Sequence, residues 1–395
     1  MRDPRPASLK ILHVTRAPVG GIFRHILDVA EGQVARGHRV GIVCDSMTGG
    51  ERAAAALAAI EPRLAFGVTR YQIARELTAA DVVGLVQVSR QIRRIQPDVL
   101  HGHGAKGGAF LRLTPAVSQA IRVYTPHGGS LHYGPGTMRG MVYSRIERFL
   151  MNRTDLFLFE SAFARDTYYA LVGQPRGEVQ VVHNGVGAAE FAPITPVPDP
   201  TELVYVGEFR RIKGADVLID ALAHLHRMGR MVRLTLAGDG EETAALHAQV
   251  TRLQLSDYVR FIGHVPARTG FSHGRLLVVP SRGDSLPYVV IEAAAAGIPM
   301  LAVRVGGIPE VFGPLGSRLL RPEDPPAMAQ AIAAALDDPA GINADAEVLR
   351  QRVREKFSQD AMVEGVLAAY AKTFATSRHG RAGWRDAAFV GGSIS

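Results

Sequence analysis

Short hydrophobic runs alternate with longer helix-like segments along most of the chain. In the first half, buried strands are expected at residues 9–15, 39–44, 98–101, 122–125, 156–159 and 179–182. Helices are expected between them at residues 22–35, 79–96, 106–114 and 137–151. Strands that alternate with helices indicate βαβ units, so the first half predicts a mostly parallel sheet.

The same alternation restarts after a proline-rich segment. Residues 193–200 carry four prolines in eight positions, which suits neither a helix nor a central strand. Beyond it, strands are expected at residues 203–206, 233–237, 259–262, 276–279 and 300–303, and helices at 215–228, 241–253 and 288–296. The chain is therefore predicted to hold two α/β domains joined by a linker at residues 193–200.

Composition agrees with this organisation. A chain of 395 residues exceeds what one hydrophobic core usually supports, and 47% hydrophobic with 21% charged residues is typical of a soluble globular protein. The sequence shows neither a signal peptide nor an apolar stretch that could span a bilayer. The single cysteine, Cys44, excludes an internal disulfide and fits a reducing compartment, so we expect a cytoplasmic protein. Its apolar neighbours predict a packing role rather than a nucleophilic one.

The net charge of +8 is confined to the first half. Residues 1–195 hold 23 Lys and Arg against 15 Asp and Glu, whereas residues 196–395 hold 22 of each kind. A basic half suggests an anionic partner, such as a phosphorylated lipid, a membrane surface or a nucleic acid. An ordinary basic surface without a partner explains the same excess.

Unusual residues follow the predicted strands, where ligands collect in doubly wound sheets. Gly20 and Gly21 open the first helix, and glycines there allow a phosphate to approach the helix N-terminus. They do not form the G-x-G-x-x-G fingerprint of dinucleotide-binding enzymes, which argues against a dehydrogenase.

Histidines follow two further strands, in His101-Gly-His103-Gly and in Thr125-Pro-His127-Gly-Gly. No cysteine or carboxylate lies at companion ligand spacing, so a metal site is not expected. The histidines either hydrogen-bond a sugar or orient a loop, or they are structural side chains with partners in the fold.

Two loops of the second half carry charges suited to a phosphorylated ligand. Residues 207–214 place Arg210, Arg211 and Lys213 between a strand and a helix, where cations beside glycine suit a diphosphate, although a solvated basic turn has the same sequence. Residues 280–293 place Asp284 before a helix and Glu292 within it. One carboxylate could accept hydrogen bonds from a sugar while the other accepts them from a ribose.

These motifs occur in an order that matches a known family. An acid, seven residues and Glu-Ala follow Pro280-Ser281, and Ala-Gly-x-Pro and Gly-Gly-x-x-Glu then extend the pattern to Glu310. Together with the glycines and histidines above, this set resembles the retaining glycosyltransferases of family 4, which have the GT-B fold. The resemblance implies two Rossmann-like doubly wound domains that face each other across a cleft.

The resemblance also implies the domain limits. Residues 1–195 would form an acceptor-side domain, completed by a C-terminal helix at about 358–376, and residues 200–357 would bind the nucleotide sugar. Residues 377–395, which are small, polar and glycine-rich, are expected to form a disordered tail.

Roles for individual residues follow from the same resemblance. Glu292 would hold the ribose, Asp284 and the backbone amides after it the donor hexose, and Lys213 with an arginine the diphosphate. His127 would lie beside the anomeric centre, Gly21 would close over the donor, and residues 261–265 would lie beside the base. The implied donor-binding set is Gly20, Gly21, Arg210, Arg211, Lys213, Gly238, Val265, Asp284, Ser285, Leu286 and Glu292; the catalytic set is His127, Asp284 and Lys213; His101 and His103 lie on the acceptor side.

Two positions depart from the family pattern. Asp284 stands where the family usually has Glu, and Glu208 stands where many members have Arg. The cationic role would then fall to Arg210 or Arg211.

The expected reaction is transfer of a hexose from a nucleotide diphosphate sugar to an acceptor hydroxyl, with retention at the anomeric carbon. The chain has no D-x-D triplet, so neither a metal nor another cofactor is expected. A nucleotide-sugar epimerase, a sugar phosphorylase and a non-catalytic scaffold that binds sugar nucleotides are the alternatives with this architecture.

The acceptor is expected to be a carbohydrate or a lipid-linked sugar rather than a nucleic acid. Arg139, Arg145, Arg148 and Arg153 surround apolar residues at 141–150, a composition that suits an anionic lipid surface. An amphipathic helix that packs its apolar face inward is the alternative.

Overall fold

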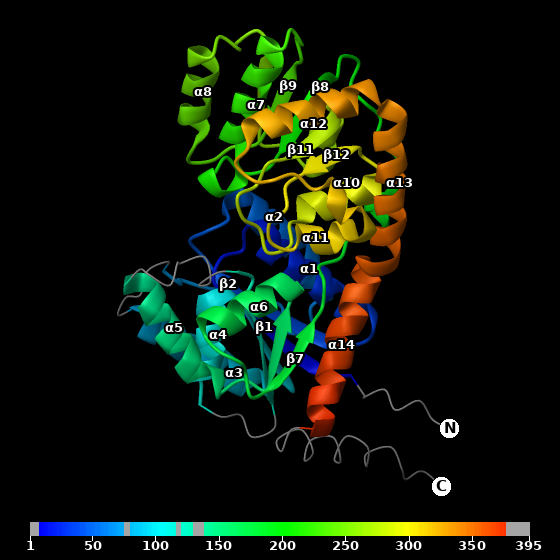
Figure 1. The fold of residues 1–395 in the computed structure, drawn as a ribbon. Helices are drawn as coiled ribbons and strands as arrows, with labels where there is room; N and C mark the ends of the chain where they lie inside the picture. Colours follow the sequence, from blue (N-terminus) through cyan, green and yellow to red (C-terminus); the bar gives the residue numbers. More distant parts are fainter. Residues whose placement is uncertain (1–7, 75–79, 116–119, 129–137, 377–395) are drawn as a thin grey trace, which may run out of the picture. The chain divides into compact units, whose positions relative to one another are not determined.

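The strands form two parallel sheets, one in each of two units of the chain, and helices pack against both sheets (Figure 1). The computed structural model describes residues 8–74, 80–115, 120–128 and 138–376. Unit 1 takes the residues up to His183 together with those from Gln359 onward, and unit 2 runs from Asn184 to Ser358. The tail expected at residues 377–395 lies outside the described residues.

Unit 1 contains, within its described residues, a seven-stranded parallel sheet in the order β3-β2-β1-β4-β5-β6-β7. Its strands are β1 (Lys10–Thr15), β2 (Arg39–Asp45), β3 (Val68–Tyr71), β4 (Val99–His103), β5 (Ile121–Thr125), β6 (Leu156–Phe159) and β7 (Glu178–Val181). Its helices are α1 (Gly20–Ala35), α2 (Gly50–Ile60), α3 (Ala80–Ile95), α4 (Gly104–Leu113), α5 (Met138–Met151), α6 (Ala162–Leu171) and α14 (Gln359–Thr376).

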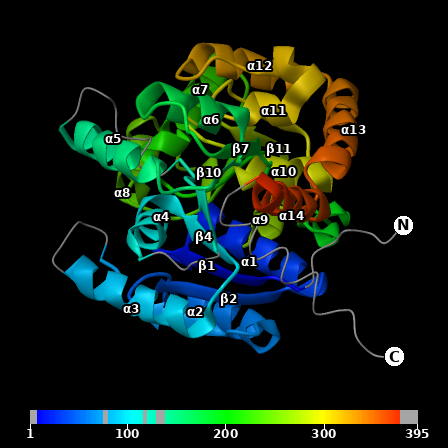
Figure 2. The same cartoon turned by 90° about the horizontal axis from the view of Figure 1, so that it is seen from below.

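Helices cover both faces of this sheet (Figures 1 and 2). Alternate residues of a strand point to opposite faces, so Ile11 packs with α1 and α14, while Leu12 and Val14 pack with α3 and α4. Cys44 is fully buried, and burial raises the pKa of its thiol to about 11. A protonated, inaccessible thiol suits the predicted packing role.

Unit 2 contains a five-stranded parallel sheet, among the residues described, in the order β10-β9-β8-β11-β12. Its strands are β8 (Thr201–Val206), β9 (Leu234–Ala237), β10 (Val259–Gly263), β11 (Gly274–Val279) and β12 (Met300–Ala302). Its helices are α7 (Ala215–Arg227), α8 (Thr243–Arg252), α9 (Ala267–Phe271), α10 (Tyr288–Ala296), α11 (Ile308–Phe312), α12 (Pro325–Asp337) and α13 (Pro339–Lys356). Helices α7, α8 and α12 contribute to the core on one face, and α9, α10, α11 and α13 to the core on the other.

The division between the units differs from the expected linker at residues 193–200. It falls between His183 and Asn184, because the proline-rich segment packs onto unit 2 instead of bridging freely. Arg268 donates to the Pro193 carbonyl at 3.2 Å, and the Val197 amide donates to the Ser272 carbonyl at 3.0 Å. Contacts of this kind fix the segment without a helix or a central strand, which its prolines exclude.

Helix α5 is held by a buried ion pair. Arg112 of α4 donates through Nη1 and Nη2 to the carboxylate of Glu147 at 2.8 and 3.1 Å, and the two side chains are 0% and 4% exposed. The Tyr124 hydroxyl donates to the same carboxylate at 3.0 Å. The inner face of α5 is therefore partly polar.

No helix in the described parts of the chain has the length and hydropathy needed to cross a bilayer.

Candidate active site

The strand order of unit 2 places a crevice between β8 and β11. From β8 the sheet grows in one direction through β9 and β10, and in the other through β11 and β12. The helices that follow β8 and β11 therefore diverge to opposite faces, and the loops at the carboxyl ends of these strands leave a ligand site between them. The loop after β8 carries Lys213, and the loop after β11 carries Asp284.

Lys213 and Asp284 are in contact. The Lys213 ammonium donates to Asp284 Oδ1 at 2.5 Å, and the side chains are 26% and 11% exposed. Asp284 Oδ2 is buried and has no hydrogen-bond partner among the described residues. A buried carboxylate oxygen without a partner is costly, and a ligand hydroxyl would remove that cost.

Arg282, which the sequence patterns did not single out, ties the two loops together. Its guanidinium forms two hydrogen bonds of 2.7 Å to Asp216, in the first turn of α7, and one of 2.6 Å to the Arg211 carbonyl. The Asp216 carboxylate raises the pKa of Arg282 through hydrogen bonds. This fork–fork pair fixes the spacing of Lys213 and Asp284. Its partners are 66 positions apart in the sequence, so sequence patterns do not reveal it.

Glycines allow the loops to approach each other closely. Gly214 has a φ of +72°, and a Cβ there would lie 2.2 Å from the Pro280 carbonyl oxygen. Gly306 has a φ of +56° and lies against the backbone of Asp284, whose carbonyl accepts a hydrogen bond from the Gly307 amide at 3.3 Å. Any side chain at Gly214 or Gly306 would displace the Asp284 loop.

Several other predicted site residues of unit 2 lie close to Lys213 or Asp284 in the sequence. Glu292 is buried in the second turn of α10, which begins at Tyr288, and Leu286 is buried in the loop before it, while Ser285 is half-buried. Arg210 and Arg211 are exposed, and Arg210 Nη1 lies 3.6 Å from the carboxylate of Glu208. Glu208 thus pairs with Arg210, one of the two arginines expected to take the cationic role that many family members give to an arginine at position 208.

Two further loops lie at the carboxyl edge of the same sheet. Gly238 follows β9, and a Cβ at this position would lie 1.9 Å from the Gly207 carbonyl oxygen, so the loops after β8 and β9 touch through their backbones. Val265 is half-buried after β10, where the Phe261 ring stacks on His247 with centroids 3.8 Å apart. The place of Val265 beside the base of the nucleotide stays a prediction.

Unit 1 has an equivalent crevice between β1 and β4, where its strand order also reverses. Helix α1 begins at Gly20 and Gly21, and α4 begins at Gly104 after His103. Gly20 has a φ of +63°, and a Cβ there would contact no described atom within 4 Å, so glycine serves the backbone conformation rather than packing.

His127 follows β5 in a strained conformation. Its φ of +52° lies in the left-handed region, which costs free energy for a residue other than glycine and recurs at functional sites. The side chain is half-buried, and its Nε2 lies 3.1 Å from His103 Nδ1.

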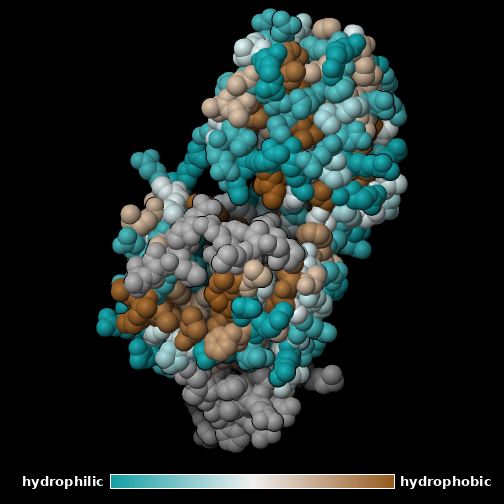
Figure 3. Space-filling view, turned by 60° about the vertical axis from the view of Figure 1, so that its left-hand side comes forward, coloured by the Kyte–Doolittle hydropathy of each residue, from teal (hydrophilic) through white to brown (hydrophobic). Residues whose placement is uncertain are grey.

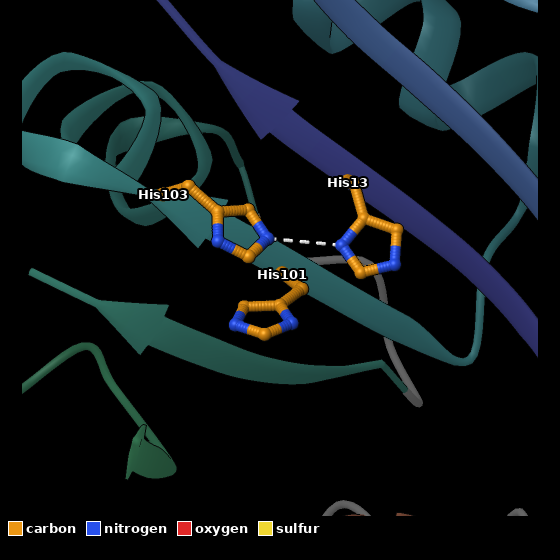
Figure 4. Close-up of side chains that lie close together, drawn as sticks. All are labelled: His13, His101 and His103. Atoms are coloured by element: carbon orange, nitrogen blue, oxygen red, sulfur yellow. Dashed lines mark hydrogen bonds between the residues drawn. The ribbon is translucent and has the colours of Figure 1, made fainter. Parts of the chain in front are cut away.

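His101 and His103 are 0% and 1% exposed. His101 hydrogen-bonds Tyr370 of α14 and Thr125 of β5 at 2.7 and 2.8 Å. His103 bonds His13 of β1 at 2.9 Å (Figure 4). Both ring nitrogens of His101 therefore have partners within the fold, and its place on the acceptor side stays a prediction.

The three clustered histidines shown in Figure 4 could form a metal site by proximity alone. Each ring nitrogen of His13, His101 and His103, however, already has a hydrogen-bond partner within the protein. Burial lowers the pKa of His13 to about 4 and holds the pKa values of His101 and His103 well below the usual range. The cluster is therefore a neutral hydrogen-bonded network, and a metal would have to break it.

Both units match known protein families. Residues 19–190 match the family described as Glycosyltransferase Family 4, and residues 200–338 match the family described as Glycosyl transferases group 1. Together these matches cover β2 to β7 of unit 1 and all five strands described in unit 2, and they include His127, Lys213 and Asp284.

Similar proteins were found over nearly the whole chain. A glycogen synthase of Mycobacterium tuberculosis is 27% identical and covers 89% of this chain and 91% of its own length. A phosphatidylinositol N-acetylglucosaminyltransferase subunit of Arabidopsis thaliana is 26% identical, with 89% and 79% covered. The structure of HepE from Anabaena in complex with UDP-glucose has a TM-score of 0.75 at 19% identity and covers 93% of this chain and all of its own.

Proposed function

Since the chain belongs to the family 4 glycosyltransferases, retaining enzymes of the GT-B fold that use nucleotide sugars, we propose that it transfers a hexose from a nucleotide diphosphate sugar to an acceptor hydroxyl during polysaccharide or glycolipid synthesis. The relatives named above support both product classes, because one is a glycogen synthase and another belongs to a phosphatidylinositol N-acetylglucosaminyltransferase. A uridine diphosphate sugar is the donor we propose, as HepE was solved with UDP-glucose.

The pair formed by Lys213 and Asp284 is the observation that carries this proposal. A diphosphate entering the crevice offers Lys213 a second anion, and the hexose offers a hydroxyl to the unpartnered Oδ2 of Asp284. The diphosphate and the hexose of a sugar nucleotide would therefore each have a complementary group, in two side chains that are in contact. Glu292, four residues into α10, is the group we propose for the ribose.

The proposed chemistry needs fixed positive charge more than a metal. The bond between the anomeric carbon and the diphosphate breaks, the acceptor oxygen bonds to the same face of the sugar, and the proton of the acceptor hydroxyl passes to the leaving diphosphate. Negative charge grows on the leaving diphosphate, and Lys213 with the free amides at the start of α10 would stabilise it. His127 is the residue of unit 1 that we assign to the donor sugar, and its strained backbone supports a functional role.

The exposed face of α5 supports an acceptor at a lipid surface. Met141, Val142, Ile146 and Phe149 are between 36% and 60% exposed, and Arg145 is exposed among them. Figure 3 shows hydrophobic side chains gathered on unit 1, on the side that carries α5 in Figure 1. Of the two interpretations of this segment, the packed amphipathic helix fits poorly, because Glu147 faces inward and four apolar side chains face outward.

Apolar side chains beside arginines suit the interface of an anionic bilayer. We therefore propose that the enzyme works in the cytoplasm and binds peripherally to the inner face of the membrane. The side chains of Arg139 and Tyr143, which were part of the expected surface, lie outside the described residues.

Isothermal titration calorimetry tests the donor site. We expect UDP and UDP-glucose to bind in the presence of a chelator, and Lys213→Ala to weaken both by roughly tenfold or more, as hydrogen bonds to charged groups contribute about 1.5–3 kcal/mol. Arg230→Ala, at an exposed pair elsewhere in unit 2, is the matched control. Binding that disappears on chelation, or that Lys213→Ala leaves unchanged, would contradict the proposal.

A further inference from the structure

A cavity of about 310 Å³ lies at the amino-terminal edge of the sheet in unit 1. The starts of β1 and β2, the segment before β3 and the last turn of α3 line it; Figure 2 shows these elements. The crevice at which α1 and α4 begin lies at the opposite, carboxyl edge of the same sheet. Strand β1 runs from Lys10 to Thr15, and at about 3.3 Å per residue it separates the two edges by about 17 Å. The cavity is therefore distinct from the candidate active site.

Three cationic side chains line this cavity from three elements of the fold. Lys10 begins β1, Arg39 begins β2, and Arg94 lies in the last turn of α3. No Asp or Glu is among the residues that line the cavity, and none of the three cations forms an ion pair within the described parts of the chain. Arg36 and Arg63 of the same unit, by contrast, pair with acidic side chains. The cavity thus gathers positive charge that the protein itself does not neutralise.

The fold holds two of these cations in place without a carboxylate at their charged ends. The Arg39 guanidinium lies over the Phe66 ring, 5.0 Å from its centroid, in a cation–π contact that uses none of its N–H donors. The backbone amide of Lys10 donates to Asp98 Oδ2 at 2.7 Å, which fixes the start of β1. Phe66 and the buried Ile95 add an apolar wall beside the cations. Such a cavity suits a ligand with an anionic group and a compact body.

The charge and the size of the cavity narrow the class of ligand. A phosphate monoester carries a charge of about −1.5 to −2 at neutral pH and three strong acceptor oxygens, which complement three cationic donors. Small-molecule sites enclose roughly 300–1,000 Å³, so a volume of about 310 Å³ is at the lower end of that range. A small phosphorylated compound fits this volume better than a whole nucleotide sugar.

We propose that this cavity is a second ligand site, which binds the phosphate monoester group of a small molecule through Lys10, Arg39 and Arg94. All three residues belong to unit 1, so the site does not depend on the donor sugar or on the proposed transfer reaction. It also gives a function to part of the positive charge that is concentrated in residues 1–195. A ligand held by these side chains would join β1 and β2 to α3 and stabilise the folded protein by mass action.

Isothermal titration calorimetry with glycerol 3-phosphate and with inorganic phosphate tests the site. The full chain carries Lys213→Ala, which removes the cation of the proposed diphosphate site in unit 2. We expect one phosphate group to bind per chain, with an affinity that falls as sodium chloride is added, because salt screens exposed charges. Glycerol, which has the same body without the charge, should not bind.

Arg39→Gln and Arg94→Gln, each in the same background, test the assignment of the residues. Each variant should bind glycerol 3-phosphate about tenfold more weakly, because it loses a hydrogen bond between charged groups. Arg93→Gln is the matched control: it removes the same charge from the same last turn of α3, but Arg93 does not line the cavity. We expect it to keep the unsubstituted affinity.

Thermal unfolding gives a second measurement that does not depend on calorimetry. Without ligand, Arg94→Gln should unfold at the same temperature as Arg93→Gln or higher, because it removes repulsion between like charges around the cavity. Glycerol 3-phosphate should raise the Tm of Arg93→Gln and raise that of Arg94→Gln less.

A phosphate monoester can belong to a soluble metabolite or to a lipid headgroup, and sedimentation with vesicles distinguishes these sources. The vesicles contain phosphatidylcholine with phosphatidic acid. Weaker sedimentation of Arg94→Gln than of Arg93→Gln identifies a lipid headgroup, whereas equal sedimentation of the two variants, with the difference in glycerol 3-phosphate binding retained, identifies a soluble ligand.

Two results would overturn the inference. One is the absence of phosphate binding in the Lys213→Ala protein. The other is an equal loss of affinity in Arg93→Gln and Arg94→Gln, which would indicate a diffuse basic surface instead of a site. Both results are independent of whether UDP-glucose binds to unit 2, so failure of the proposed donor and failure of this site are distinguishable.

Discussion

Replacing Asp284 with Asn should lower the rate of sugar transfer without lowering the affinity for the nucleoside diphosphate. The substitution keeps the shape of the side chain but removes its charge. Asp284 Oδ2, which is buried without a described partner, is the atom proposed to bind the hexose hydroxyl. Hydrogen bonds to charged groups contribute about 1.5–3 kcal/mol, so transfer should fall about ten- to a hundredfold.

The ion pair predicts the second effect. Lys213 uses one of its hydrogen bonds on Asp284 at 2.5 Å, and an amide holds it less strongly. Partly exposed ion pairs contribute about 0–1 kcal/mol, so the affinity for UDP should stay the same or rise by at most about fivefold. Glu292→Gln should differ in kind, because loss of the ribose contact weakens UDP and UDP-glucose together.

Calorimetry with UDP and turnover of UDP-glucose measure the two effects separately. Asp284→Glu completes the series, since it restores the usual family residue with a side chain one methylene longer. We expect reduced transfer, because Lys213 and the backbone at Gly306 leave little room around Asp284. Full transfer activity in Asp284→Asn, or a UDP affinity that falls in parallel with transfer, would refute the assignment of this carboxylate to the sugar.

Three further outcomes are expected. Glu147→Ala should lower the free energy of unfolding in urea by about 3–5 kcal/mol, because it leaves Arg112 charged, buried and unpaired; a loss below about 1 kcal/mol would show that water reaches the site. Phe149→Ser should reduce sedimentation with anionic vesicles at low salt, while Met228→Ser, at a similarly exposed site in unit 2, should not. Burial lowers the pKa of His13 from 6.5 to about 4, so its contribution to stability is complete above pH 6.5 and is lost as pH falls toward 4; a free energy of unfolding that is flat over this interval would contradict a neutral buried histidine.

The sequence was a good guide where local periodicity reflects burial. Strands such as β1, β2 and β11 are almost wholly buried, and their uninterrupted apolar runs predicted them to within a few residues. The sequence patterns missed β3, an edge strand whose four residues are all half-buried. Such a strand has no strong apolar signal, because one side of it has no neighbour to pack against. The polar helix α13 was missed for a related reason, as few of its residues face the core.

The candidate site was likewise predictable from the sequence only in part. The sequence by itself determined that glycines and charged residues end up at the carboxyl ends of parallel strands, because chain direction and alternation fix which loops meet there. Only the tertiary structure decided which groups pair. Lys213 and Asp284 are 71 residues apart, and Gln33 and Tyr370 are 337 apart, so no periodicity relates them. A hydrogen bond depends on the position of two atoms to within a fraction of an ångström, and packing of the whole sheet, not the spacing of residues along the chain, sets that position.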